Sequence, residues 1–175
     1  PFDRYIKGDG IATSDTVIKY DRNDVIAFYQ GLEPRFAVRY LLPDNSSIKA
    51  GYAYNYQYVH LVTLSAVSLP TDIWFPTTGN FIPQKTTQFT IGFLKPLHNS
   101  LEFSMEYYYK DFQGITEITG VEADQLQKSY WEQTILQGTG TSQGLEFLIT
   151  KKTGQLNGIL SYTISATDRK FNDLN

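Results

Sequence analysis

Apolar and polar residues alternate with a period of two along most of this chain, and this pattern limits the possible folds more than any other feature of the sequence. In residues 48–58, Ile48, Ala50 and four tyrosines fall on one side, whereas Lys49 and Asn55 fall on the other. Successive side chains of a β-strand point to opposite faces, so this run predicts a strand with one apolar and one polar face. The four tyrosines are Tyr52, Tyr54, Tyr56 and Tyr58.

Six segments show this alternation, and clusters of turn-forming residues separate them. We expect strands at about residues 32–41, 48–58, 86–94, 101–110, 143–150 and 155–167. The alternation allows the fourth strand to continue to residue 118, and residues 131–136 are a candidate extension of the fifth. Near the N-terminus, residues 16–20 and 25–29 flank a polar turn and predict a small hairpin.

The charged residues within these strands all fall on the polar face. They are Arg39, Lys49, Glu102, Glu106, Lys110 and Glu146. The opposite face is apolar and aromatic over about ten residues per strand, which is the length that a tilted strand needs to cross a membrane. The strands therefore predict a transmembrane β-barrel with the charges facing its interior.

The connections between the strands alternate between short and long. Outer-membrane barrels have short turns on the periplasmic side and long loops on the extracellular side. We therefore expect the short turns, with Asp44, Asn99 and Thr153, to lie in the periplasm, and both chain ends to lie outside.

The predicted fold class is all-β: an antiparallel up-and-down meander of about six long strands of a transmembrane β-barrel. Residues 1–31 would form an extracellular loop or hairpin, and residues 168–175 would begin the next extracellular loop. Residues 32–167 would form barrel strands with two long extracellular loops, 59–85 and 119–142. Known bacterial barrels start at eight strands, so we expect an incomplete barrel whose other strands come from the parent chain or from other copies.

A soluble antiparallel β-sandwich is the alternative, because it also shows a period of two with one buried face. Such a fold would favour a binding module of the adhesin or lectin type. The four same-face tyrosines argue against it, since each hydroxyl buried in a dry core needs a partner. They fit an aromatic belt at a membrane interface, with Tyr107 and Tyr109 at a similar height.

The composition narrows the possible partners and chemistry. The net charge is −3 and no run of Lys or Arg occurs, so nucleic acid is not an expected partner. The chain has no cysteine, and no apolar stretch is long enough for a transmembrane helix. It begins without Met or a signal peptide, which suggests a mature product or an internal piece.

No group of residues in the sequence predicts catalysis, a metal site or a cofactor. The only histidines, His60 and His98, fall at opposite ends of the predicted barrel. Glu102 and Glu106 lie roughly 13 Å apart along one strand, too far for a glycosidase pair. We expect them to pair with Lys49, Lys110 or Arg39 on nearby strands. We therefore expect no enzyme activity.

The candidate ligand-binding residues are large aromatic side chains in the two long loops. They are Trp74, Phe75, Tyr130 and Trp131. Aromatic residues of this size are common in binding surfaces, although they also pack loops together.

Several motifs resemble one family. The run Gly31-Leu32-Glu33-Pro34-Arg35-Phe36, followed by Ala37-Val38-Arg39-Tyr40, resembles a strand of the TonB-dependent outer-membrane receptors of Bacteroidetes. Ser47-Ile48-Lys49-Ala50-Gly51-Tyr52 and Ser68-Leu69-Pro70-Thr71-Asp72-Ile73-Trp74 are similar to the strand and loop that follow, and Glu106-Tyr107-Tyr108-Tyr109-Lys110 to a later strand. The resemblance covers about residues 31–171 and extends to the SusC/RagA-like or carboxypeptidase-regulatory-domain-containing group.

The resemblance implies the middle of a barrel of about 22 strands in a much larger receptor. Such a receptor imports a scarce small or oligomeric ligand across the bacterial outer membrane. A glycan, a peptide, a siderophore and cobalamin all remain open as ligands. The implied partners are TonB, through an N-terminal part that this chain lacks, the outer-membrane lipid and a surface lipoprotein.

Overall fold

The computed structural model describes residues 2–6, 16–20, 25, 27–62, 73–78, 82–98, 100–118 and 135–171. All regular structure in these residues is β-strand. Six strands form the main sheet: β3 (Arg35–Leu41), β4 (Ser47–Gln57), β7 (Gln84–Pro96), β8 (Leu101–Ile118), β9 (Ile135–Lys151) and β10 (Gly158–Lys170). Two further pairs are β1 (Phe2–Ile6) with β2 (Thr16–Tyr20), and β5 (Val59–Val62) with β6 (Ile73–Pro76).

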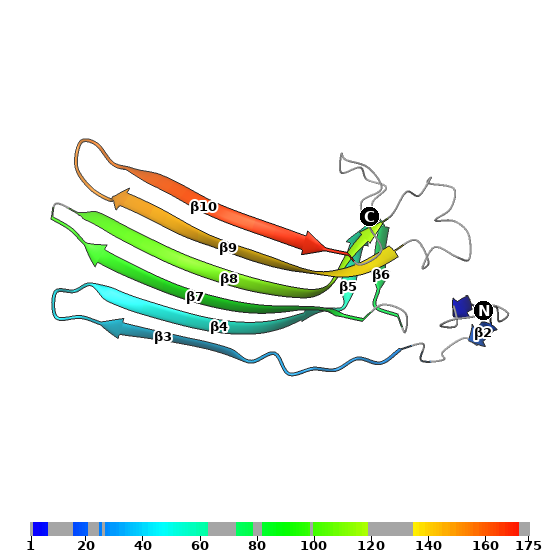
Figure 1. Ribbon diagram of the computed structural model, residues 1–175. Helices are drawn as coiled ribbons and strands as arrows, with labels where there is room; N and C mark the ends of the chain where they lie inside the picture. Colours follow the sequence, from blue (N-terminus) through cyan, green and yellow to red (C-terminus); the bar gives the residue numbers. More distant parts are fainter. Residues whose placement is uncertain are drawn as a thin grey trace.

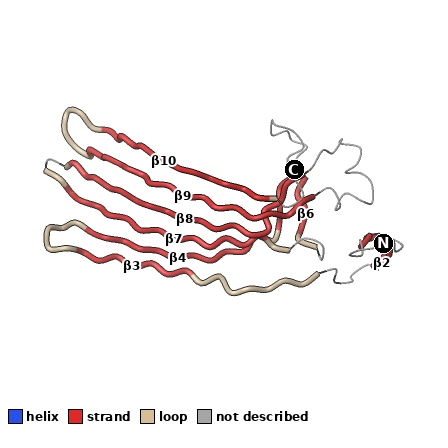
Figure 2. Tube along the Cα trace, viewed as in Figure 1, coloured by secondary structure: helices blue, strands red, loops and turns tan. Residues whose placement is uncertain are grey.

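The main sheet has the order β10-β9-β8-β7-β4-β3, and every neighbouring pair is antiparallel. It is one curved layer in Figure 1, and Figure 2 shows the short turns together at one end of it. Strands that follow one another in the chain are therefore neighbours in space, apart from the inserted β5–β6 pair. The predicted all-β antiparallel meander is confirmed. The described sheet is open, because β3 and β10 each have a single neighbour.

Two strand predictions need correction. β9 begins at Ile135, whereas the sequence placed its start at about residue 143, assigned residues 119–142 to a loop and offered only residues 131–136 as an extension of the strand. Gly138 and Gly140 resemble turn signals, but here they allow the backbone of β10 to approach closely. A Cβ at Gly138 would lie 2.4 Å from the Lys170 carbonyl oxygen, and one at Gly140 would lie 2.8 Å from that of Asp168.

The N-terminal hairpin has a different partner from the one expected. Residues 16–20 pair with residues 2–6, not with residues 25–29. The segment after β2 instead lies along the far end of β4, where the Pro34 carbonyl accepts a hydrogen bond from the Tyr54 amide at 3.0 Å. The β5–β6 pair within the first long connection was also not expected, since each of its strands has only four residues.

The register shows that the predicted charged positions share one face. Directly opposed residues in antiparallel strands point to the same side. One row crosses the sheet through Arg39, Lys49, Gly92, Glu106 and Glu146. We call this side the charged face, and the opposite side, with the row Val38, Ala50, Ile91, Tyr107, Leu145 and Ile164, the apolar face.

Among the described residues, no second sheet covers the apolar face. Val38 is 66% exposed, Ile91 55% and Tyr162 64%, and the only large hydrophobic residue buried within the described residues is Phe75. A sandwich would bury this face against another layer. The described residues contain no helix that is long and apolar enough to cross a membrane.

Candidate functional site

Charged side chains divide the apolar face into three levels. We consider the described strands of the main sheet up to the Gly114 bulge. At the short-turn end, the charged residues of the apolar face are Lys95 and Lys151. At the opposite end, they are Lys85, Asp111, Asp168 and Lys170. Lys85 and Lys95 lie ten residues apart on β7, which corresponds to about 34 Å along the strand and about 26 Å at the usual tilt. This uncharged band matches the height of about 25 Å found in outer-membrane barrels.

Aromatic residues mark the limit of this band at the end of the sheet nearer the long connections. Phe36, Tyr52, Phe89 and Tyr109 form one row. The next row toward the long connections contains Tyr54 and Asp111. The Tyr54 and Tyr56 rings meet edge to face at 5.1 Å, and Tyr56 stacks on Tyr58 at 5.9 Å. Aromatic side chains therefore gather at the end of the sheet from which the long connections extend, where the sequence predicts an aromatic belt.

The charged face carries an ion pair that spans three strands. Lys49 on β4 and Glu106 on β8 both lie opposite Gly92 on β7, and their side chains form a salt bridge above it. A Cβ at Gly92 would lie 2.6 Å from Lys49 Cε, so a larger residue would displace the pair. Arg39 and Glu146 extend the row on either side and make no ion pair within the described residues. The face is thus polar and suited to a wet interior or to another protein segment.

Polar contacts fix the short turns. The Ser46 amide donates to Asp44 Oδ1 at 3.1 Å, and the Ser46 hydroxyl donates to the same oxygen. These hydrogen bonds lower the pKa of Asp44, the hydroxyl contributing most. Lys152 pairs with Glu102 at 2.9 Å, and the Thr153 hydroxyl donates to Ser100 Oγ at 2.7 Å. Asn99 lies outside the described residues.

The Glu33-Pro34-Arg35 motif lies at the beginning of β3, at the end of the strand away from the β3–β4 turn. Pro34 has no amide hydrogen, and the regular pairing of β3 with β4 begins at the next residue, Arg35. The Glu33 carboxylate takes over, because its Oε1 accepts a hydrogen bond from the Tyr56 amide at 3.1 Å while its Oε2 pairs with Arg35 at 3.2 Å. The Glu33 side chain therefore satisfies a backbone amide of β4 beyond the point where β3 pairs with it.

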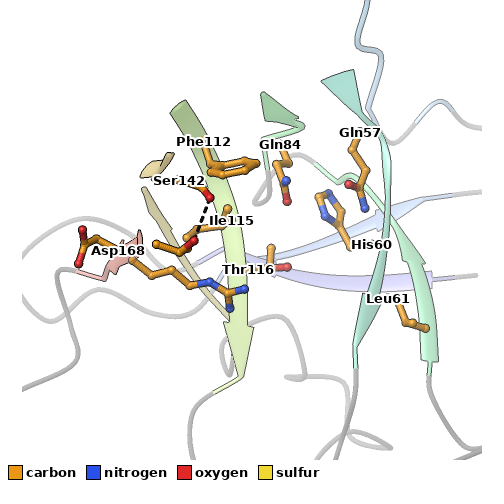
Figure 3. A pocket seen from close by; sticks show the side chains of 11 residues that line it. Gln57, His60, Leu61, Gln84, Phe112, Ile115, Thr116, Ser142 and Asp168 are labelled. Carbon is orange, nitrogen blue, oxygen red and sulfur yellow. Dashed lines mark hydrogen bonds between the residues drawn. The ribbon is translucent and has the colours of Figure 1, made fainter. Parts of the chain in front are cut away.

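A pocket of about 330 Å³ lies at the long-connection end of the charged face. Figure 3 shows Gln57 and Gln84 on one side of it with His60 from β5, and Phe112 beside Ser142 on the other. The Ser142 and Thr167 hydroxyls share a hydrogen bond of 2.8 Å at its far side. The lining combines amides, hydroxyls and an aromatic ring, which are the usual groups for holding a small ligand.

His60 lines this pocket from the β5–β6 pair. It is 2% exposed and stacks on Phe75 with ring centroids 5.3 Å apart. Burial lowers its pKa, and its Nε2 atom has no hydrogen-bond partner within the described residues. The described residues contain no cluster of three potential metal ligands around it or elsewhere.

The structure separates the expected ligand-binding aromatics. Trp74 is 66% exposed, whereas its neighbour Phe75 is 4% exposed and packs against His60. Tyr130 and Trp131 lie outside the described residues. The pocket residues Gln57, Gln84 and Phe112 were not anticipated. The one signal for them was their position on the charged face where the alternation ends.

The comparisons with known proteins agree with this geometry. A family model described as TonB dependent receptor-like, beta-barrel, matches residues 6–175, which is nearly the whole chain. No curated protein and no solved structure matches significantly. Members of this family are receptors and transporters of the bacterial outer membrane that work with TonB. On the strength of this match and the single two-faced sheet, the chain belongs to the TonB-dependent receptor-like β-barrel family.

Proposed function

We propose that this chain is part of the wall of a barrel that imports a scarce ligand across the outer membrane. The observation that carries the proposal is the two-faced sheet, in which an uncharged band about 26 Å high backs a face with a row of charges. In this proposal the apolar face meets lipid and the charged face lines the interior. The missing strands are supplied elsewhere in the receptor, since an open edge is not tolerated in lipid.

The proposed orientation places the short turns in the periplasm and the long connections outside. Because the chain contains no cysteine, single cysteines introduced at Gln30 and Thr153 can show on which side of the outer membrane each end of the sheet lies. In intact cells an impermeant maleimide should label the Gln30→Cys receptor, and it should label the Thr153→Cys receptor only after the outer membrane is opened. The reverse pattern would invert the proposed orientation.

The proposed ligand contacts lie at the long-connection end. They comprise exposed Trp74, the pocket lined by His60, Phe75 behind His60, and the loop residues Tyr130 and Trp131. Trp74→Ala should lower uptake at limiting ligand several-fold, whereas Trp74→Phe should retain most of it, because an aromatic surface remains. Uptake that is equal in both variants would remove Trp74 from the proposed site.

The finer assignment to the SusC/RagA-like or carboxypeptidase-regulatory-domain-containing group of Bacteroidetes rests on the sequence motifs. It brings with it a surface lipoprotein as a proposed partner.

The class of transported ligand can be tested by growth. A strain without the receptor and a strain without TonB can be compared on an oligosaccharide, a peptide, a ferric siderophore and cobalamin as limiting nutrients. The proposal predicts that both strains fail on the same nutrient. It is overturned if the receptor-deletion strain grows wherever the wild type grows.

A further inference from the structure

We propose that Lys95 and Lys151 form a binding site for the headgroup of an anionic phospholipid at the short-turn end of the apolar face. The inference rests on the proposed orientation, which places this end at the periplasmic leaflet. It concerns the lipid-facing wall, and it is independent of the ligand that the receptor carries.

The register places the two lysines on either side of one strand. Lys95 on β7 lies opposite Phe103, and Lys151 on β9 lies opposite Leu101, so both flank the beginning of β8. At the usual strand spacing and rise, their Cα atoms lie about 12 Å apart, a distance over which two flexible lysine side chains can converge on one phosphate. The geometry therefore suits a single headgroup.

The surface between the lysines suits an acyl chain. Leu101 and Phe103 lie between them, and Met105 and Ile149, 37% and 38% exposed, continue the same face toward the middle of the uncharged band. An apolar strip that ends in two cations matches an amphipathic molecule with an anionic head. Lysines at membrane interfaces extend their ammonium groups toward the headgroups in this way.

The distribution of charge favours an anionic partner at this end alone. Both strand charges of the apolar face are positive here, whereas the opposite end mixes Lys85 and Lys170 with Asp111 and Asp168. The one acid that pairs with either lysine within the described residues is Asp44, whose Oδ2 lies 3.6 Å from Lys95 Nζ. Lys151 has no ion-pair partner within the described residues, while Lys152 next to it pairs with Glu102 on the charged face.

The test uses the full receptor in lipid nanodiscs that contain phosphatidylglycerol and phosphatidylethanolamine with identical acyl chains. Native mass spectrometry measures which lipid is retained. Each lysine near the headgroups contributes about a fivefold preference, so Lys95→Gln with Lys151→Gln should lower the preference for phosphatidylglycerol about 25-fold. Lys152→Gln is the matched control and should leave it unchanged.

A third variant predicts a change in the opposite direction. Asp44→Asn keeps an oxygen for Ser46 but removes the charge that competes for Lys95, so the preference for phosphatidylglycerol should rise. An unchanged preference in the double variant would overturn the proposal, as would an equal loss in Lys152→Gln or binding of inorganic phosphate in place of the lipid. Uptake of the transported ligand is measured separately, so failure of the transport proposal is distinguishable from failure of this one.

Discussion

At the scale of single residues, most glycines of this sheet lie where a neighbouring atom leaves no room for a Cβ, and fewer lie in turns. Gly138 lies under the last residues of β10, where a Cβ would meet the Lys170 carbonyl oxygen at 2.4 Å. Gly158, at the other end of the same strand pair, has no atom within 4 Å of a Cβ. A sequence reading cannot separate these two situations, because both appear as a glycine beside a strand. This explains why the start of β9 was placed eight residues too late.

This difference predicts unequal effects of one substitution. Gly138→Ala should destabilise the folded barrel by about 1–3 kcal/mol, since backbone must move to admit the methyl group. Gly158→Ala should be neutral or slightly stabilising, because alanine restricts the unfolded chain without a clash. The temperature at which the receptor loses its folded mobility in detergent gels measures both. Equal effects would show that the close contact at Gly138 does not form.

At the scale of elements, the long strands follow from the sequence, but the short ones do not. In β4, the alternation of Ile48, Ala50 and Tyr52 with Lys49 and Gly51 is strong enough to fix both the strand and its faces. β5 and β6 have four residues each, too few for a period of two to stand out. They pair through contacts distant in sequence, with His60 opposite Phe75. The pocket that His60 lines was missed for the same reason.

The β5–β6 pair should respond to pH through His60. Burial lowers the pKa of this imidazole below its ordinary value of 6.5, so the folded pair favours the neutral form. Above pH 6.5 the imidazole is neutral in both the folded and the opened pair. As the pH falls below 6.5, the opened state gains the proton first and the folded pair loses stability.

Hydrogen exchange of residues 59–62 and 73–78, corrected for the intrinsic rate, should therefore show weaker protection at pH 5.5 than at pH 7.5. His60→Phe is the matched variant, because it keeps a ring against Phe75 but cannot be protonated. Its protection should stay constant between the two pH values. A pH response that persists in this variant would have to come from another group.

At the scale of the whole molecule, the two faces of the sheet were predictable, whereas the sheet formed by the described residues is open and does not show how a barrel would close. The prediction that Arg39, Lys49, Glu106 and Glu146 share one face is confirmed, since a single slip of register would have scattered them. The sequence predicted a pairing of Glu106 with Lys49, Lys110 or Arg39, and the salt bridge above Gly92 shows that Lys49 is the partner. The choice among the three could not be predicted, because the pair joins strands that are not neighbours. Similarly, the level at which the uncharged band ends emerges only when strands are aligned.

Adjacent residues on β7 give the sharpest test of which face meets lipid. Ile91 lies in the middle of the apolar face, and Thr90 points to the charged face. Ile91→Lys should destabilise the barrel by about 2–4 kcal/mol, because it places a charge near the middle of the bilayer. Thr90→Lys should cost far less, since the new charge faces the polar interior. The folded fraction recovered from outer membranes measures both variants, and a larger loss for Thr90→Lys would reverse the assignment of the faces.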